Sequence, residues 1–412
     1  MHFSLIRQAF AAFFVALVVS ACGGGSSAPA PTGGINVVPG DSKATVTWTM
    51  EPGVQYWVFY APVSTKFPNV TTTDWVNIPG AQAFINVKSP YSVTGLVNGF
   101  QYSFTVNGRT GDGPGGPGAP SVTTLPRPAG TTWGKGGDMG TNSLRTVTYG
   151  IGSDNLGYYL AQGDGGTTYK STTGLTWTPV PAAGPAQINS NIYTLTRFVG
   201  VGNGGSIVTS TDLATWTNAV SNTTENLNSV TSNGALAVAV GNNGVIRTST
   251  DGATWTAATT VPTTKNLYGV TYSGNGFWIA VGAGGTVLTS TDGTTWAEKA
   301  SGTTSDLRAV TVQVISSYTF VAVGNNGAVV SSADNGTTWT AQTTGITGNF
   351  LAVSPSTSQL VAVGAGGLIA SSADGVTWTQ RTSGTTADLF SVLAGLSQYV
   401  VVGAGGVNIN SQ

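Results

Sequence analysis

The chain has 412 residues, with 15 basic and 16 acidic side chains, and charged residues make up only 8% of it. Such sparse and balanced charge forms neither a basic stripe for nucleic acid nor an acidic tail. The single His is His2 and the single Cys is Cys22, so the chain beyond residue 22 lacks the residues of Ser–His–Asp and Cys–His catalysis and of His/Cys zinc or copper sites. We expect no metal, no cofactor and no nucleic-acid partner.

Residues 1–22 resemble a bacterial lipoprotein signal. Arg7 supplies a positive charge, residues 9–19 form an apolar segment too short for a convincing membrane span, and residues 19–22, VSAC, resemble a lipobox. Removal of residues 1–21 would leave Cys22 as an acylated N-terminus that anchors the protein. Gly23 at the next position implies, by the same resemblance, the outer membrane, with the periplasmic or surface face left open. The alternative is an ordinary secretory signal.

Residues 22–34, CGGGSSAPAPTGG, are rich in Gly, Ser and Pro and predict a flexible tether. Random-coil scaling gives this tether a reach of about 20 Å. It would hold the following domain near a membrane without orienting it.

Residues 35–126 predict a β-sandwich. Apolar and polar residues alternate in residues 44–48, 56–60 and 102–106, which is typical of half-buried strands. The segment resembles a fibronectin type III module, because Trp48 occupies the place of that family's core Trp and Leu96 with Tyr102 fits its tyrosine corner. We expect a final strand over 121–125 and a stiff junction at 126–128. A spacer role is favoured over ligand binding.

Residues 127–412 contain an internal repeat. A turn with Gly at both ends recurs seven times about 40 residues apart, a spacing typical of four-stranded propeller blades. The apolar runs before most of these turns predict buried strands. The seven turns are at 163–166, 202–205, 241–244, 282–285, 324–327, 364–367 and 403–406.

The last copy of the repeat is incomplete. Ser411 aligns with Ser249, but the Asp, Gly and Trp that follow Ser249 have no counterpart there. Residues 130–133, GTTW, are a substitute just before the first full copy and supply the Gly and the Trp. An outer strand over 130–134 would complete the last blade and leave no open sheet edge. The sequence therefore predicts an all-β, closed seven-bladed β-propeller behind the sandwich.

A second turn follows the first in six copies. Residues 332–339, SADNGTTW, match the Asp-box (BNR) pattern, and the other copies are one residue shorter. Together the two turns resemble the photosystem II stability/assembly factor family over residues 130–412, which implies Asp boxes at outer turns. We interpret the Asp residues as turn-formers, although Thr173 replaces the first Asp and Leu213 replaces a Gly. The motif residues are Asp212, Asp251, Asp292, Asp334 and Asp374, with Trp177, Trp216, Trp255, Trp296, Trp339 and Trp378.

Glycoside hydrolysis is the enzymatic alternative, because Asp boxes also occur in sialidases and two carboxylates suffice for that chemistry. The repeat region contains only Glu225 and Glu298 as Glu residues. A sialidase also needs three clustered Arg and an early Phe-Arg-Ile-Pro-like motif, and we find no such motif. We therefore expect a protein that is not an enzyme.

The candidate binding site is a ring of side chains at one mouth of the propeller channel. Arg and aromatic residues are favoured at recognition surfaces, and a concave mouth is a usual ligand location. The alternative is that these residues only plug the channel. We predict a monomeric, lipid-anchored, non-catalytic scaffold that recognises an envelope protein or glycan, with a purely structural adhesion protein as a further alternative. The predicted ring is Arg145, Tyr193, Asn228, Tyr268, Arg308, Leu351 and Phe390.

Overall fold

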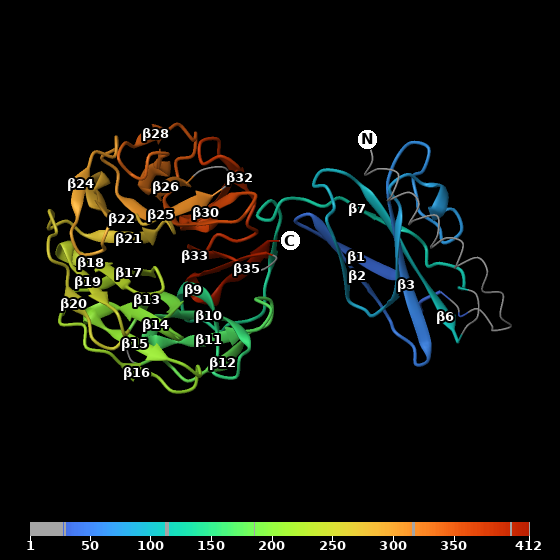
Figure 1. Cartoon of the computed structure of the whole chain (residues 1–412), viewed down its shortest axis with the longest axis horizontal. Helices are drawn as coiled ribbons and strands as arrows, with labels where there is room; N and C mark the ends of the chain where they lie inside the picture. Colours follow the sequence, from blue (N-terminus) through green and yellow to red (C-terminus); the bar gives the residue numbers. More distant parts are fainter. Residues whose placement is uncertain are drawn as a thin grey trace. The chain divides into compact units, whose positions relative to one another are not determined.

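The computed structural model describes residues 28, 30–111, 115–184, 186–314, 318–395 and 398–411. The chain divides into two compact units, Met1–Pro128 and Ala129–Gln412 (Figure 1). The predicted signal peptide, Cys22 and most of the tether lie outside the described residues. Within the described residues, no helix has the length and apolar character needed to cross a membrane.

The first unit contains two antiparallel sheets, in the orders β1-β2-β5 and β4-β3-β6-β7. Their facing side chains, including Trp48, Tyr56 and Phe104, form one buried core. The Tyr102 hydroxyl accepts a hydrogen bond of 3.1 Å from the backbone N–H of Val97. The strands are β1 (Ile35–Gly40), β2 (Lys43–Trp48), β3 (Val54–Pro62), β4 (Gln82–Val87), β5 (Tyr91–Thr94), β6 (Tyr102–Thr110) and β7 (Val122–Thr124), with a 3-10 turn at Trp75–Asn77.

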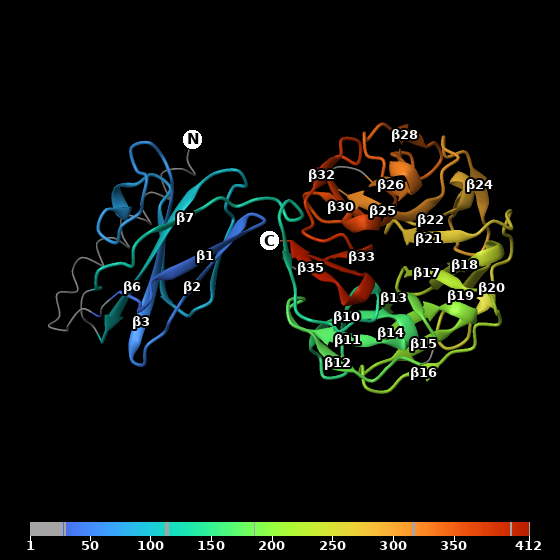
Figure 2. The same cartoon turned by 180° about the vertical axis from the view of Figure 1, so that it is seen from behind.

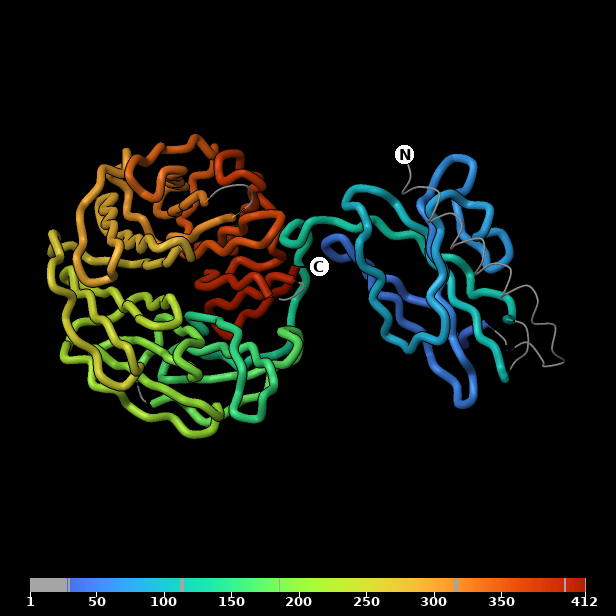
Figure 3. The backbone as a smooth tube through the Cα atoms, in the orientation of Figure 1, coloured from blue at the N-terminus to red at the C-terminus, as the bar shows by residue number. Residues whose placement is uncertain are grey.

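The second unit contains seven four-stranded antiparallel sheets in its described residues. They are arranged around a common axis (Figures 1 and 2), and the backbone trace follows them in chain order (Figure 3). The all-β, β-propeller prediction is confirmed. We number these sheets 1 to 7, and in each of them the first strand named below is the innermost.

Sheet 1 consists of β9 (Leu144–Ile151), β10 (Gly157–Gly163), β11 (Thr168–Ser171) and β12 (Thr178–Val180). Sheet 2 consists of β13 (Ile188–Thr194), β14 (Arg197–Gly202), β15 (Ile207–Ser210) and β16 (Thr217–Asn218). Sheet 3 consists of β17 (Leu227–Ser232), β18 (Ala237–Gly241), β19 (Ile246–Ser249) and β20 (Thr256–Ala257). Sheet 4 consists of β21 (Leu267–Tyr272), β22 (Trp278–Gly282), β23 (Val287–Ser290) and β24 (Ala297–Lys299). Sheet 5 consists of β25 (Leu307–Val314), β26 (Tyr318–Gly324), β27 (Val329–Ser332) and β28 (Thr340–Gln342). Sheet 6 consists of β29 (Phe350–Pro355), β30 (Leu360–Gly364), β31 (Ile369–Ser372) and β32 (Thr379–Arg381). Sheet 7 consists of β33 (Leu389–Ala394), β34 (Tyr399–Gly403), β35 (Asn408–Ser411) and β8 (Trp133–Lys135).

The second strand of each sheet is buried on both faces, which explains its continuous apolar sequence. In β18, Val238 and Val240 pack against sheet 4. Ala237 and Ala239 on the opposite face pack against sheet 2. Each sheet is therefore held through side-chain packing with both of its neighbours.

The turn between the second and third strands is a short 3-10 turn in every sheet of the second unit. In sheet 3, Asn243 and Gly244 have φ values of 54° and 70°. This left-handed region favours Asn and Gly, which explains the recurring sequence. The turns are η2 (Asp164–Gly166), η3 (Asn203–Gly205), η4 (Asn242–Gly244), η5 (Ala283–Gly285), η6 (Asn325–Gly327), η7 (Ala365–Gly367) and η8 (Ala404–Gly406).

In sheets 2 to 6, the turn between the third and fourth strands is held by its own Ser and Asp side chains. In sheet 3, the Ser249 hydroxyl accepts the N–H of Gly252 at 2.9 Å, and the Trp255 indole donates to the Gly252 carbonyl at 3.3 Å. The Asp251 carboxylate accepts the N–H groups of residues 253 and 254 at 2.8 and 2.9 Å. The backbone N–H groups of Thr215 and Ala214 likewise lower the pKa of Asp212 to about 2. Asp292, Asp334 and Asp374 also accept backbone N–H groups of their own turns.

Leu213 departs from this turn motif, and we expect Leu213→Gly to destabilise the protein although it restores the usual residue. Leu213 has a φ of 62°, and relieving that conformation would gain about 1 kcal/mol. However, its side chain is 1% exposed and packs with Tyr158, Leu160 and Phe198, so removing it costs about 3 kcal/mol or more. Denaturant unfolding should therefore show a net loss of about 2 kcal/mol. A more stable Leu213→Gly protein would contradict this reasoning.

Strand β8, from the start of the second unit, completes sheet 7. Trp133 is paired with Ser411 and Lys135 with Ile409. The Trp133 indole donates to the Gly130 carbonyl at 3.2 Å, and Trp177, Trp255, Trp296, Trp339 and Trp378 make the equivalent bond in their turns. Trp216, in the turn that contains Leu213, is the exception. The strand spans 133–135 and not the predicted 130–134, because the chain turns at Gly130, where φ is 88°.

One hydrogen-bond type links neighbouring innermost strands, and sheets 7 and 1 share it. The Val230 N–H donates to the Ser190 hydroxyl at 3.3 Å between sheets 3 and 2. The Val147 N–H donates to the Ser391 hydroxyl at 3.2 Å between sheets 1 and 7. Sheets 7 and 1 therefore meet in the same way as consecutive sheets.

Candidate binding surface at the ends of the innermost strands

Each innermost strand of the second unit begins with a buried apolar residue followed by a residue that the sheet pairing skips. In sheet 3, Leu227 pairs with Gly241 and Ser229 with Val240, so Asn228 lies in a β-bulge. Bulges re-aim a side chain away from the sheet, and all seven bulge residues are partly exposed. We call them the inner ring: Arg145, Asn189, Asn228, Tyr268, Arg308, Leu351 and Phe390.

The predicted ring included Tyr193, and this placement is wrong. The sheet 2 bulge follows Ile188, so Asn189 occupies the ring position. Tyr193 lies near the opposite end of β13, where it is paired with Phe198 at a ring-centre distance of 5.0 Å. β13 contains two Ile residues, and the buried anchor is Ile188, while Ile192 is only partly buried.

In sheet 2, the same spacing to the 3-10 turn as in sheet 3 identifies the ring residue. Asn189 is 14 residues before Asn203, and it donates to that side chain at 3.0 Å. Asn228 is also 14 residues before Asn242 and donates to it at 3.0 Å. Both Asn residues additionally donate to the backbone of the next innermost strand, at 2.9 and 2.8 Å.

The residue type in the inner ring varies together with the first residue of the 3-10 turn in the same sheet. Arg145 donates to Asp164 at 2.9 Å, and Arg308 donates to Asn325 at 3.1 Å. Polar ring residues therefore accompany Asp or Asn in sheets 1, 2, 3 and 5. In sheets 4, 6 and 7, Tyr268, Leu351 and Phe390 accompany Ala283, Ala365 and Ala404.

Two Arg residues of the inner ring lie over aromatic rings from the preceding sheet. The Arg145 guanidinium carbon is 4.4 Å from the ring centre of Phe390, and that of Arg308 is 4.3 Å from the ring centre of Tyr268. Each Arg also has a carboxylate partner, Asp164 at 2.9 Å and Asp306 at 3.3 Å. The two Arg side chains remain 30% and 31% exposed. They are thus fixed in orientation but still accessible.

Hydrogen bonds between sheets hold the backbone around the inner ring. In sheets 3 to 7, the side chain of the residue before the buried anchor accepts an N–H from the 3-10 turn of the preceding sheet. Asp306 accepts from Gly284 and Asp388 accepts from Gly366, both at 2.8 Å. Asn226, Asn266 and Asn349 make the equivalent bonds. The ring side chains therefore project from a rigid frame.

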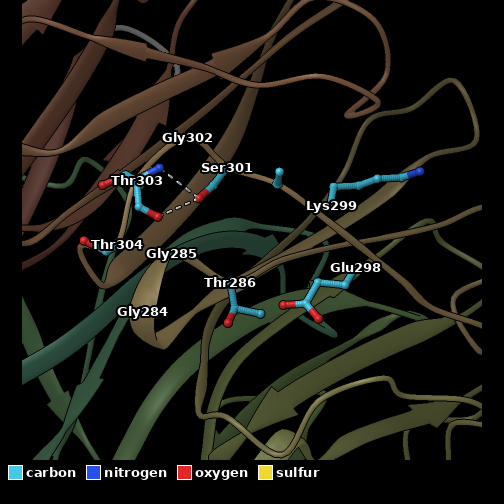
Figure 4. Close-up of a pocket in the computed structure, with 10 residues that line it drawn as sticks. Gly284, Gly285, Thr286, Glu298, Lys299, Ser301, Gly302, Thr303 and Thr304 are labelled. Atoms are coloured by element: carbon cyan, nitrogen blue, oxygen red, sulfur yellow. Dashed lines mark hydrogen bonds between the residues drawn. The ribbon is translucent and has the colours of Figure 1, made fainter.

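Three hollows at the rim of the same end lie beside 3-10 turns, in sheets 4, 6 and 7. Their volumes are about 640, 1140 and 380 Å³. Figure 4 shows the first, where Glu298 and Thr286 lie near one another while the Ser301 hydroxyl bonds the backbone of Thr303. In this hollow the Ser301 hydroxyl is used to hold its own loop, and no inner-ring residue lines any of the three hollows. We therefore place the candidate site at the inner ring and not in these hollows.

The described residues contain no group of three or more His, Cys, Asp or Glu side chains placed to hold a metal ion. The inner ring offers planar cations, aromatic rings and amide groups. Such an arrangement suits non-covalent recognition.

Comparison with known proteins supports the architecture. Residues 229–350 match the DUF6242 beta propeller domain. The structure of YCF48 bound to D1 peptide is 19% identical, with 68% of this chain and 96% of that chain covered and a TM-score of 0.54. YCF48 from Cyanidioschyzon merolae is 18% identical, with coverages of 68% and 98% and a TM-score of 0.55. The WD40 beta propeller domain of Doa1 is 10% identical, with coverages of 68% and 97% and a TM-score of 0.56. No curated protein matches the sequence. These likenesses show that the chain carries a β-propeller fold.

Proposed function

We propose that this protein is a non-catalytic binding or assembly scaffold at the cell envelope. Its inner ring would recognise another protein, with an envelope glycan as the alternative ligand. The observation that carries the proposal is the pair of partly exposed Arg side chains held over Phe390 and Tyr268. Arg and aromatic residues dominate binding energy at protein interfaces. The solved YCF48 structure with a D1 peptide is a propeller of similar fold with a bound peptide.

The finer architecture is part of the same proposal. We infer a closed seven-bladed ring, supported by the pairing of β8 with β35 and by the bond between Val147 and Ser391. We infer Asp boxes at its outer turns, supported by their Ser and Asp hydrogen bonds. The first unit would be a fibronectin type III-like spacer, supported by its sandwich and the Tyr102 bond.

The binding proposal is tested with the double variant Tyr268→Ala/Arg308→Ala. We expect it to lose most of its cross-linking to envelope proteins in intact cells, because one of the two Arg–aromatic pairs is gone. The matched control is Tyr193→Ala/Arg381→Ala, which removes the same residue types away from the inner ring. Thermal unfolding of both variants checks that they are folded. Unchanged cross-linking by a folded Tyr268→Ala/Arg308→Ala protein would refute the ring as the binding surface.

We also propose that the protein is lipid-anchored to the outer membrane through Cys22. Cys22→Ser should abolish incorporation of a labelled fatty acid and move the protein from the membrane fraction to the soluble fraction. Two or more acyl chains are needed for stable anchoring, so their loss should release nearly all of the protein. Membrane retention of an unlabelled Cys22→Ser protein would show that another feature anchors it.

A further inference from the structure

The two Arg–aromatic pairs of the inner ring are stacking platforms of fixed orientation. Each consists of a guanidinium from one sheet over the aromatic ring of the preceding sheet, Arg145 over Phe390 and Arg308 over Tyr268. A hydrogen bond from each Arg Nε, to Asp164 and to Asn325, fixes the edge of the guanidinium plane. Planar guanidinium groups stack on aromatic faces, and here the plane is already positioned before a ligand arrives.

The charge around these platforms does not favour an acidic ligand. Arg145 and Arg308 are each paired with a carboxylate, at 2.9 and 3.3 Å. The surrounding backbone consists of the 3-10 turns and the connections that lead into the innermost strands. In these described segments Lys265 is the only further cation beside the two Arg residues of the ring. Five acidic residues lie in the same segments: Asp138, Asp164, Glu225, Asp306 and Asp388. An acidic peptide or a phosphodiester chain would meet more carboxylates than free cations.

An apolar sector lies beside the first platform. Phe390 and Leu351 are ring residues of adjacent sheets, and the turn residues of those sheets are Ala404 and Ala365. None of these four side chains carries a polar atom that an apolar ligand would deprive of water. Apolar side chains of a ligand would therefore be accommodated next to a stacking platform.

We propose that the inner ring binds a polypeptide segment through its aromatic side chains, stacked on the two Arg–aromatic platforms, and that it does not select acidic segments. This inference rests on the proposed function and specifies the chemistry of its ligand. Uncharged segments that carry Tyr, Trp or Phe would bind best, and binding would depend little on salt because both platforms are already neutralised.

The test is selection of random peptides displayed on phage by the purified chain from residue 22 onward, with counter-selection on the Tyr268→Ala/Phe390→Ala variant. The inference predicts enriched peptides that contain aromatic residues without an excess of Asp or Glu. For a selected synthetic peptide, Tyr268→Ala and Phe390→Ala should each weaken binding roughly fivefold, and high salt should change it little. Arg308→Lys should weaken binding as much as Arg308→Ala, because Lys keeps the charge but not the plane. Tyr193→Ala is the control that should leave affinity unchanged.

The outcomes separate the two claims. Acid-rich peptides whose affinity falls with salt, or Arg308→Lys binding like the unchanged protein, would overturn the stacking inference while keeping the ring as a binding site. Peptides without aromatic residues would overturn it in the same way. Failure to enrich any peptide over the folded double variant would overturn both the inference and the recognition of polypeptides by the inner ring.

Discussion

Trp133→Ala should lower the free energy of unfolding by about 3 kcal/mol and release strand β8 from sheet 7. The Trp133 ring packs 6.3 Å from that of Tyr399, and its indole donates to Gly130 at 3.2 Å. No turn joins β8 to its partner β35, since these strands lie far apart in the sequence. Loss of the indole should therefore raise hydrogen exchange along β35 as well as reduce stability, and both are measurable by denaturant unfolding and exchange mass spectrometry.

Trp177→Ala is the matched control for this experiment. Trp177 is also partly exposed, and it donates to Gly174 at the same distance of 3.2 Å. Trp177 immediately precedes β12, which a turn joins to its partner β11, so loss of the indole should cost similar stability with less exchange in the partner strand. Equal exchange in β35 and β11 for the two variants would contradict the idea that β8 closes the ring.

Gly244→Ala should cost about 4 kcal/mol, which makes it one of the most damaging single-methyl changes available. Gly244 has a φ of 70°, and a Cβ there would lie 2.1 Å from the Thr263 carbonyl oxygen. That oxygen belongs to the backbone and cannot rotate away, so the turn or the connection between β20 and β21 must shift. Denaturant unfolding measures the loss.

Gly234→Ala separates the effect of backbone conformation from that of the collision. Gly234 has a φ of 90° and no atom within 4 Å of its added Cβ, so we expect a cost of about 1 kcal/mol. The difference between the two variants is the contribution of the Thr263 carbonyl. Similar costs for both would show that close packing of the turn against this segment is unimportant.

Much of the propeller could be predicted because its repeat combines turns and strands that are each locally determined. Asn243 and Gly244 suit positive φ, and the apolar run that became β18 suits a strand packed on both faces. The pairing of the 130–133 segment with Ser411 could be predicted from an incomplete copy alone. The extent of β8 could not, because Thr131 and Thr132 favour a strand by residue type but lie in the bend that follows Gly130.

The inner ring was harder to predict because a β-bulge has no distinct sequence pattern. In β13, Ile188 and Ile192 are equally apolar, so composition alone does not decide whether Asn189 or Tyr193 follows the buried anchor. The partnership of Arg145 with Asp164 and Phe390 also could not be read from the sequence. The contact with Phe390 joins sheets 1 and 7, which are remote in the chain.

The position of β8 also sets the order in which the molecule can mature during synthesis. The ribosome makes β8 before every other strand of the propeller, yet its partner β35 follows all of them. Strand β8 therefore has no pairing partner while sheets 1 to 6 are translated, and sheet 7 can form only after β35 has been made. A chain that stops before β35 would therefore leave β8 without the strand it pairs with.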